Sequence, residues 1–299
     1  MKIYLSNFKN IQSVCVETAN SIAHFLPSEG GKMASFMAGG KEYLVQNPSK
    51  EFLHLGLDGS FEKTECAGFD DMFPTIDPVT IKDGDRAGKT YPDHGEVARL
   101  SFDYQINDDS LVMVATSKEL NYAYKKTITE ENGALKIDYQ IENLSSEVFP
   151  CVWAGHCLID ISGGGEVLTP FIDGDEVDLV NDVKGKFGKK GERLPLNSQM
   201  LAFDKTPDGH CYKLYFPQKL SGGTVGFRYA DGKVFSMEFS GLSYLGLWLN
   251  HGFLNDCSCI GLEPCTAGYD TVYNAEKYGQ KGEIKGKDKL SFSLKISVK

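Results

Sequence analysis

The stretch LKIDYQIEN, residues 135–143, alternates between apolar and polar side chains along its length. Every second residue is apolar, namely Leu135, Ile137, Tyr139 and Ile141, and between them lie Lys136, Asp138, Gln140 and Glu142. Successive side chains of an extended chain point to opposite faces, so the pattern predicts a half-buried antiparallel strand. The C-terminal stretch KLSFSLKISVK, residues 289–299, repeats the pattern with Leu290, Phe292, Leu294, Ile296 and Val298.

Turn dipeptides that contain glycine separate such segments throughout the chain. Asp231-Gly232, between TVGFRYA (224–230) and KVFSMEFS (233–240), predicts a type I′ hairpin because both central residues tolerate a positive φ. Many strands joined by such turns, without a convincing helical period, predict an all-β fold: a large antiparallel β-sandwich with little helix. We expect one domain over residues 1–299, because β-sandwiches of this length occur as single units.

One region differs from this pattern. Residues 173–197, DGDEVDLVNDVKGKFGKKGERLPLN, are polar, charged and poorly periodic. Two interpretations are open, a solvated surface loop and a flap beside a functional site.

The charge of the chain limits its partners. The formal net charge is -10 at pH 7, and only Arg86, Arg99, Arg193 and Arg228 are arginines. A field of this sign repels phosphate polymers and anionic membranes, so we expect neither nucleic acid nor a membrane as a partner. No charged segment followed by a long apolar run opens the sequence, and no stretch has the length of a membrane span. A cytoplasmic location is therefore expected.

The 8 cysteines are too few for a disulfide scaffold in a chain of this length, and we expect them to be reduced and mostly buried. Cys257 and Cys259 form a CxC pair, but no second pair lies at zinc-finger spacing. No structural metal site is predicted.

Two histidines occupy positions that favour chemistry. His94, in YPDHGEVARL (91–100), precedes a glycine in a predicted loop, where it is either exposed or at a pocket rim. His156 interrupts the apolar run CVWAGHCLIDIS (151–162). A buried imidazole needs a hydrogen-bond partner for each nitrogen or a shifted pKa, so His156 is either a satisfied core residue or a proton donor in a dry pocket.

Two further stretches carry a carboxylate and an aromatic wall. Glu263 ends the apolar run of NDCSCIGLEPCTAGYD (255–270), where burial would make its pKa movable, unless the side chain is already back in water. In SYLGLWLNHGF (243–253), Tyr244, Trp248 and Asn250 share one face of a strand. A tryptophan beside amide and hydroxyl groups suits a sugar, although Trp248 is equally typical of a core.

Together these stretches resemble the aldose 1-epimerase (galactose mutarotase-like) family, whose fold is a large antiparallel β-sandwich. The resemblance rests on PDHGEVAR with His94, GHCLI with His156, and GLWLN followed by GLEP with Trp248 and Glu263. It implies that Glu263 takes the proton of the anomeric hydroxyl while His156, as an imidazolium titrating near neutrality, protonates the ring oxygen. His94 would orient the sugar, and Trp248 and Asn250 would belong to the sugar-facing wall.

The sequence departs from the family in one place. Galactose mutarotases carry an Asn-Arg pair early in the chain, whereas ECAGFDDMFPTI (65–76) occupies the comparable region here. Asp70 and Asp71 are the replacement that the resemblance implies, and they either bind sugar hydroxyls or stabilise a turn. Arg99 either reaches the substrate or pairs with a nearby carboxylate.

The predicted function is that of an isomerase, an aldose 1-epimerase that interconverts the α and β anomers of an aldose such as galactose or glucose without cofactor or metal. Three alternatives remain: a non-catalytic sugar-binding protein, a hexose-6-phosphate 1-epimerase, and a metal site made by His94, His156 and Glu263. The sequence leaves open whether the protein is a monomer or a homodimer.

Overall fold

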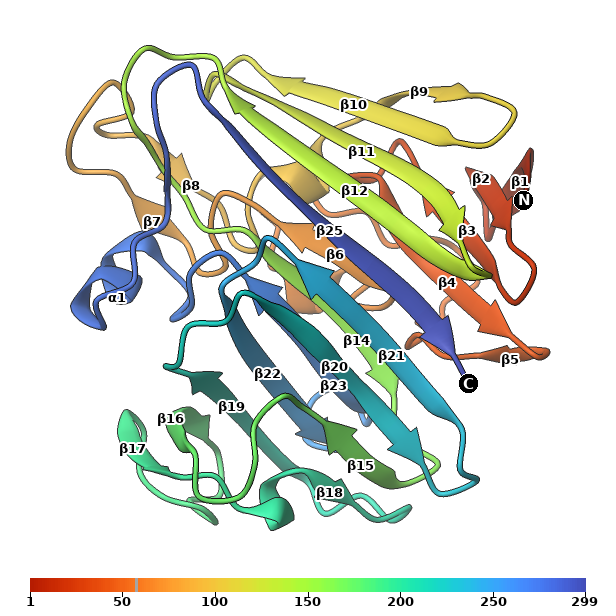
Figure 1. The fold of residues 1–299 in the computed structure, drawn as a ribbon, viewed down its shortest axis with the longest axis vertical. Helices are drawn as coiled ribbons and strands as arrows, with labels where there is room; N and C mark the ends of the chain where they lie inside the picture. The colour runs from red at the N-terminus through yellow and green to blue at the C-terminus, as the bar shows by residue number, and fades with distance from the viewer. Residues whose placement is uncertain (57–58) are drawn as a thin grey trace.

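The computed structural model describes residues 1–56 and 59–299, and this part of the chain forms two large antiparallel sheets that pack face to face (Figure 1). The 12-stranded sheet contains, in spatial order, β1 (Lys2–Phe8), β2 (Ile11–Glu17), β3 (Ile22–Leu26), β4 (Lys32–Ala38), β6 (Phe69–Met72), β14 (Ala154–Asp160), β23 (Ser258–Cys265), β22 (Tyr244–His251), β19 (His210–Phe216), β16 (Glu176–Asp182) and β17 (Glu192–Pro195), and β5 (Lys41–Glu42) pairs with β4. The predicted all-β sandwich is confirmed.

The 9-stranded sheet lies in front of the first in Figure 1. Its order is β18 (Ala202–Phe203), β15 (Gly165–Leu168), β20 (Gly222–Tyr229), β21 (Val234–Ser240), β25 (Lys289–Val298), β12 (Ala134–Asn143), β11 (Tyr122–Glu131), β10 (Leu111–Ser117) and β9 (Asp103–Ile106). Two small sheets pair β13 (Phe149–Pro150) with β24 (Glu283–Ile284) and β7 (Val79–Thr80) with β8 (Thr90–Tyr91). Helical structure is limited to α1 (Val272–Lys277) and the 3₁₀ turns Phe61–Lys63, Val97–Arg99 and Ser198–Met200 in the described residues.

The alternating stretches form the centre of the 9-stranded sheet. β12 pairs with β25, and Ile137 lies opposite Leu294 while Tyr139 lies opposite Phe292. These four side chains are buried, so the alternation does direct one face of both strands into the core. The rings of Tyr139 and Phe292 stack with centroids 4.7 Å apart, and Trp153 packs against both.

The predicted hairpin is present, but the predicted turn type is wrong. β20 and β21 pair as expected, with Arg228 opposite Val234. Gly232 has φ +87°, whereas Asp231 does not adopt a positive φ, so only one central residue is left-handed. The backbone N–H of Tyr229 donates to the carbonyl of Lys233 at 2.8 Å. This is a three-residue loop that ends on a left-handed glycine, not the two-residue type I′ turn.

Neither interpretation of residues 173–197 described them fully, because they contain two strands at the edge of the 12-stranded sheet. Val177 and Leu179 of β16 are fully buried, and β16 pairs with β19 and β17. Polar residues on the opposite face hid this short alternation. The side chain of Asp178 pairs bidentately with Arg193, at 2.7 and 2.9 Å.

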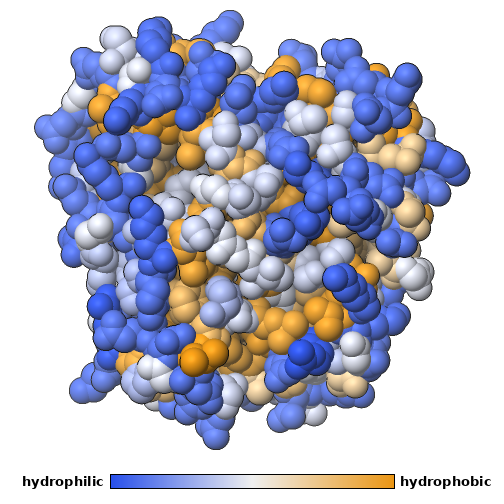
Figure 2. Space-filling view, in the orientation of Figure 1, coloured by the Kyte–Doolittle hydropathy of each residue, from blue (hydrophilic) through white to orange (hydrophobic). Residues whose placement is uncertain are grey.

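The two faces of the 12-stranded sheet have different roles. Apolar residues of its central strands, Cys157, Leu247 and Leu262 among them, belong to the main core between the sheets. The alternate residues point away from the 9-stranded sheet, and the functional candidates lie among them. Figure 2 shows the other side of the molecule, the outer face of the 9-stranded sheet, where hydrophilic residues dominate the rim. In the described residues no helix is both long and apolar enough to cross a membrane.

Candidate active site

A row of polar residues crosses the face of the 12-stranded sheet that points away from the core. In the register of neighbouring strands, His156 lies opposite Asp70, Glu263 opposite Gly246, Gly246 opposite Tyr215, and Tyr215 opposite Asp178. The pairs Ala154–Cys265 and Cys157–Leu262 flank the remaining junction and place His156 opposite Glu263. We call this set the polar row: Asp70, His156, Glu263, Gly246, Tyr215 and Asp178.

His156 lies on β14 and is 5 % exposed. Its Nδ1 has no hydrogen-bond partner within the described part of the chain, which is unlike a satisfied core histidine. Burial is the main cause that lowers its pKa well below 6.5, and the positive charges of nearby residues act in the same direction. The free protein therefore holds His156 neutral at pH 7, which corrects the expectation of an imidazolium titrating near neutrality.

Glu263 lies on β23, is 1 % exposed and is held by a lysine. Burial raises its pKa above the ordinary 4.5, and the charge of Lys213 opposes that rise. Nζ of Lys213 lies 3.0 Å from Oε2 of Glu263, in an ion pair rather than a well-aligned hydrogen bond. The same Nζ lies 2.7 Å from Oδ1 of Asp270, which also accepts a hydrogen bond from Tyr215 at 2.9 Å. Glu263 is thus a buried carboxylate whose charge is compensated but whose proton affinity remains increased.

Lys213, Asp270 and Tyr215 were not predicted from the sequence. Lys213 interrupts the otherwise apolar strand HCYKLYF, and a charge in such a strand was the signal that could have identified it. Asp270 follows the strand of Glu263 in a turn, with φ +72°. Only the fold shows that the side chains of Lys213 and Asp270 meet.

Two glycines on this face lie close to the polar side chains. A Cβ atom on Gly261 would lie 3.4 Å from each of three atoms, namely Oε1 of Glu263, Cδ2 of His156 and Cβ of Trp248. A Cβ atom on Gly246 would lie 2.6 Å from the ring of Tyr215 and 3.1 Å from Oε2 of Glu263. Glycine inside a strand often marks the close approach of a ligand or of another group. Gly261 therefore forms the floor between the imidazole, the carboxylate and the indole.

His94 completes the group from a neighbouring loop. Its φ is +57°, and its ring stacks on Phe61 with centroids 4.0 Å apart and an interplanar angle of 5°. The rings of His94 and His156 lie 5.0 Å apart, and Phe61 contacts His156 edge-on at 5.1 Å. Nδ1 of His94 lies 2.8 Å from Oδ1 of Asp93. No sequence signal points to Phe61, which lies in a 3₁₀ turn that is distant from the other site residues along the chain.

Trp248 lies on the same face, with its ring 6.2 Å from that of His156. It also lines a cavity of about 420 Å³ that is bordered by Leu158, Asn250 and the 3₁₀ turn of Glu62 and Lys63. Small-molecule sites are commonly about 300–1,000 Å³ in volume. Trp248 therefore lines a cavity of suitable size and also lies near His156, although neither His156 nor Glu263 belongs to the cavity wall.

The other predicted residues have mainly structural contacts. Arg99 donates to the carbonyl oxygens of Asp93, Gly95, Gly56 and Gly59 and so ties two loops together. The amide of Asn250 donates to the carbonyls of Leu254 and Cys257 and accepts from the backbone N–H groups of Phe253 and Leu254. Sugar contacts by Arg99 and Asn250 stay predictions.

The placement of Asp71 corrects its prediction as a sugar contact. Asp70 and Asp71 are adjacent on β6, so their side chains point to opposite faces. Asp70 shares the face of His156 and pairs with Lys32. Asp71 points between the sheets, where Nζ of Lys126 lies 2.8 Å from its Oδ2. A sugar on the face of His156 cannot reach that carboxylate.

Comparison with solved structures identifies the fold. The chain superimposes on a candidate aldose 1-epimerase from Klebsiella pneumoniae subsp. pneumoniae with a TM-score of 0.73 and 14% identity, covering 98% of this chain and 81% of that one. A galactose mutarotase-like protein from Clostridium acetobutylicum superimposes with a TM-score of 0.66 and 16% identity, covering 100% of this chain and 98% of that one. A candidate aldose 1-epimerase from Escherichia coli K12 superimposes with a TM-score of 0.67 and 11% identity, covering 100% of this chain and 99% of that one.

The fold is accordingly that of the galactose mutarotase-like proteins. No protein-family model and no curated protein sequence matches the chain. Within the described residues, no three His, Cys, Asp or Glu side chains lie close enough together to hold a metal ion. This applies to His94, His156 and Glu263 as well.

The lack of a hydrogen-bond partner for Nδ1 of His156 leads to a stability prediction. Replacing a buried polar group that lacks a partner by an apolar one of similar size is close to neutral or stabilising. His156→Leu should therefore unfold in urea at the same or a higher denaturant concentration than the wild type. It should also reduce the loss of stability on acidification, because below about pH 6.5 the imidazole of the unfolded chain takes up a proton that the buried ring resists, which favours unfolding of the wild type.

His210 supplies the matched control. It is 2 % exposed, and its Nε2 lies 2.6 Å from Oδ1 of Asp182. His210→Leu should destabilise the protein by about 1–3 kcal/mol, because it removes a hydrogen bond from the buried carboxylate of Asp182, which among the described residues keeps only backbone donors. Equal destabilisation by both substitutions would make His156 an ordinary satisfied core residue.

Proposed function

We propose that this protein is a cofactor-independent aldose 1-epimerase that interconverts the α and β anomers of a free aldose. The observation that carries the proposal is that a buried imidazole whose Nδ1 lacks a partner and a buried carboxylate lie on adjacent strands, each 3.4 Å from the position that a Cβ atom on Gly261 would occupy. Anomer exchange needs one group to remove the proton from the anomeric hydroxyl and one to protonate the ring oxygen. The fold of the galactose mutarotase-like proteins supports this assignment.

Glu263 is the proposed base. It accepts the proton of the anomeric hydroxyl as the bond between the anomeric carbon and the ring oxygen breaks, giving an aldehyde. Its raised pKa favours this transfer, while the nearby charge of Lys213 keeps a useful fraction ionised. Rotation about the bond to the aldehyde carbon, followed by reclosure and return of the proton, produces the other anomer.

His156 is the proposed acid at the ring oxygen. Its neutral state in the free protein means that a second proton must be taken up before or during ring opening. The negative charge of Glu263, on the other side of Gly261, favours protonation of His156 once a bound sugar excludes water from the pair. Charges interact more strongly in a site without water. The imidazolium then protonates the ring oxygen and recovers the proton on reclosure.

Aromatic side chains form the proposed walls. Trp248 offers a ring against which the C–H face of a sugar can pack, and the stacked pair of Phe61 and His94 lies on the other side of His156. Asp93 orients His94 through Nδ1, which leaves Nε2 to meet a sugar hydroxyl.

The cations around the polar row favour an uncharged sugar over a sugar phosphate. Lys213 pairs with two carboxylates, Lys32 with Asp70, and Arg193 with Asp178. A phosphate clamp needs cationic donors that are available to the ligand. Because these three cations are already paired with carboxylates, they argue against a hexose-6-phosphate bound at the polar row.

The direct test is anomer exchange measured by NMR or polarimetry over a panel of pentoses, hexoses and hexose phosphates. The wild-type protein should accelerate exchange of at least one free aldose. Glu263→Gln should reduce that acceleration by about 10²–10⁴-fold, the usual contribution of general acid–base catalysis, and should retain the fold.

A sugar-binding protein without turnover would give a different result. It would bind an aldose in titration calorimetry while leaving the exchange rate unchanged, and this outcome would overturn the proposal. Full activity in Glu263→Gln would exclude this carboxylate as the base.

A second prediction tests whether the sugar lies above Gly261. An alanine Cβ would make ordinary contacts of 3.4 Å there, so Gly261→Ala should fold normally. The added methyl group occupies the floor of the site, and we expect a higher KM with little change in the urea unfolding midpoint. Gly163→Ala is the matched control, because its Cβ would meet only Tyr229, at 3.9 Å. Unchanged kinetics in Gly261→Ala would place the sugar elsewhere.

A further inference from the structure

Three cysteines line the cavity beside Trp248. Cys66, Cys257 and Cys259 all contribute to its wall. Cys66 and Cys257 are partly exposed, whereas Cys259 is 3 % exposed at the start of β23. A thiol at the surface of a cavity is accessible to small oxidants, and a second thiol nearby allows the first oxidation product to be captured.

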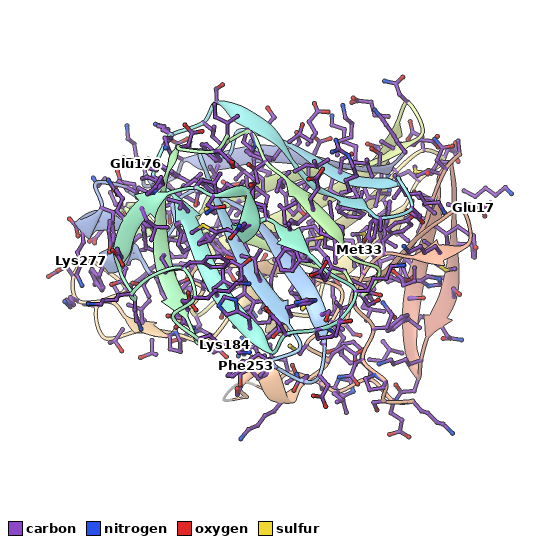
Figure 3. All side chains as sticks on the ribbon, turned by 90° about the horizontal axis from the view of Figure 1, so that it is seen from below. Glu17, Met33, Glu176, Lys184, Phe253 and Lys277 are labelled. Carbon is purple, nitrogen blue, oxygen red and sulfur yellow. The ribbon has the colours of Figure 1, made fainter. Side chains whose placement is uncertain are left out.

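The segment that carries Cys257 is fastened to the same strand as Trp248. Asn250 lies two residues after Trp248 on β22, and its Nδ2 donates to the carbonyl of Cys257 at 2.7 Å and lies 3.9 Å from Sγ of Cys259. Phe253, which is labelled at the lower edge of Figure 3, lies on this β22–β23 loop and is 55 % exposed. A covalent change at Cys257 would thus act on the wall of the cavity.

We propose that Cys257 and Cys259 are a reversible oxidation site that forms a disulfide with hydrogen peroxide and thereby alters the cavity wall at Trp248. Residues two apart on an extended chain have Cα atoms roughly 6.6 Å apart and side chains on the same face. Disulfides span Cα distances of about 4.4–6.8 Å, so this pair lies at the upper end of that range. Such a disulfide is easily reduced, as a reversible switch requires.

The two thiols have different roles in the chemistry. The Cys259 thiol hydrogen-bonds to the Cys257 sulfur and lowers the pKa of Cys257, which favours the more exposed Cys257 as the attacking thiolate. That thiolate attacks one oxygen of hydrogen peroxide, the O–O bond breaks, and hydroxide leaves as water after protonation. The sulfur of Cys259 then attacks the resulting sulfenic acid, the S–O bond breaks, and the Cys259 proton leaves with hydroxide as water. Two thiols are oxidised by two electrons in total, and one peroxide is reduced to two waters.

Mass spectrometry of the full chain tests the site directly. After brief peroxide treatment and alkylation, the peptide that contains both Cys257 and Cys259 should carry no alkyl group and should be lighter by two hydrogen atoms than the unmodified dithiol peptide. Dithiothreitol added before alkylation should restore both free thiols. Cys257→Ser should abolish this change, whereas Cys66→Ser should leave it intact. A disulfide between Cys66 and Cys257, or oxidation of Cys257 to a sulfinic acid without a disulfide, would overturn the proposal.

Tryptophan fluorescence reports the effect on the wall. The chain has 2 tryptophans, and Trp153 is fully buried between the sheets. Peroxide should change the emission of the wild type reversibly and should not change that of Cys257→Ser. A disulfide that forms without any change in emission would contradict the effect on Trp248.

The consequence for activity rests on the proposed function. Peroxide should then cause a loss of anomer exchange that dithiothreitol reverses and that Cys257→Ser does not show. Absence of exchange in untreated protein would be a failure of the proposed function, and the mass and fluorescence readouts would still decide the oxidation site. Unchanged exchange in fully oxidised protein would contradict regulation through this pair.

Discussion

The strict alternation of side chains in β14, β22 and β23 is the constraint on which the site depends. One set of residues, including Cys157 and Leu262, packs into the core between the sheets. The alternate set includes His156, Glu263 and Trp248 and lies on the opposite face. A shift of one residue in register would bury the polar groups in the core and expose the apolar ones. The energy that holds the sandwich together therefore also fixes the relative positions of His156, Glu263 and Trp248, the acid, base and wall of the proposed function.

Burial has opposite consequences for the two central groups. The carboxylate of Glu263 has a lysine within 3.0 Å, which stabilises its charged form against the cost of desolvation. Nδ1 of His156 has no partner in the described residues, so the imidazole avoids that cost by remaining neutral. Unsatisfied buried polar atoms are rare in native proteins, and those that persist commonly serve a function. The proposed function explains this contrast, because a bound sugar would supply the interaction that Nδ1 of His156 lacks.

Local patterns in the sequence were sufficient for the architecture and for part of the site. Alternation in 135–143 and 289–299 predicted the central strands, and the ordered stretches predicted His94, His156, Trp248 and Glu263, which lie together. The partnership of Lys213 with Asp270 could not be predicted, because it joins different segments only in three dimensions. Asp70 and Asp71 were named together as the replacement for the Asn-Arg pair, and only the structure shows that Asp71 points between the sheets, toward Lys126. The strands β16 and β17, at the edge of the 12-stranded sheet, were missed because polar and charged residues dominate the segment and hide its short alternation.

The most direct measurement is an NMR titration of the His156 imidazole, assigned with His156→Leu, in the presence and absence of a saturating aldose. We predict a neutral ring at pH 6.5 in the free protein, because burial lowers its pKa, and a shift of its ring resonances when the aldose binds. A His156 that titrates at or above pH 6.5 in the free protein, or whose resonances do not respond to an aldose that the protein turns over, would contradict the account.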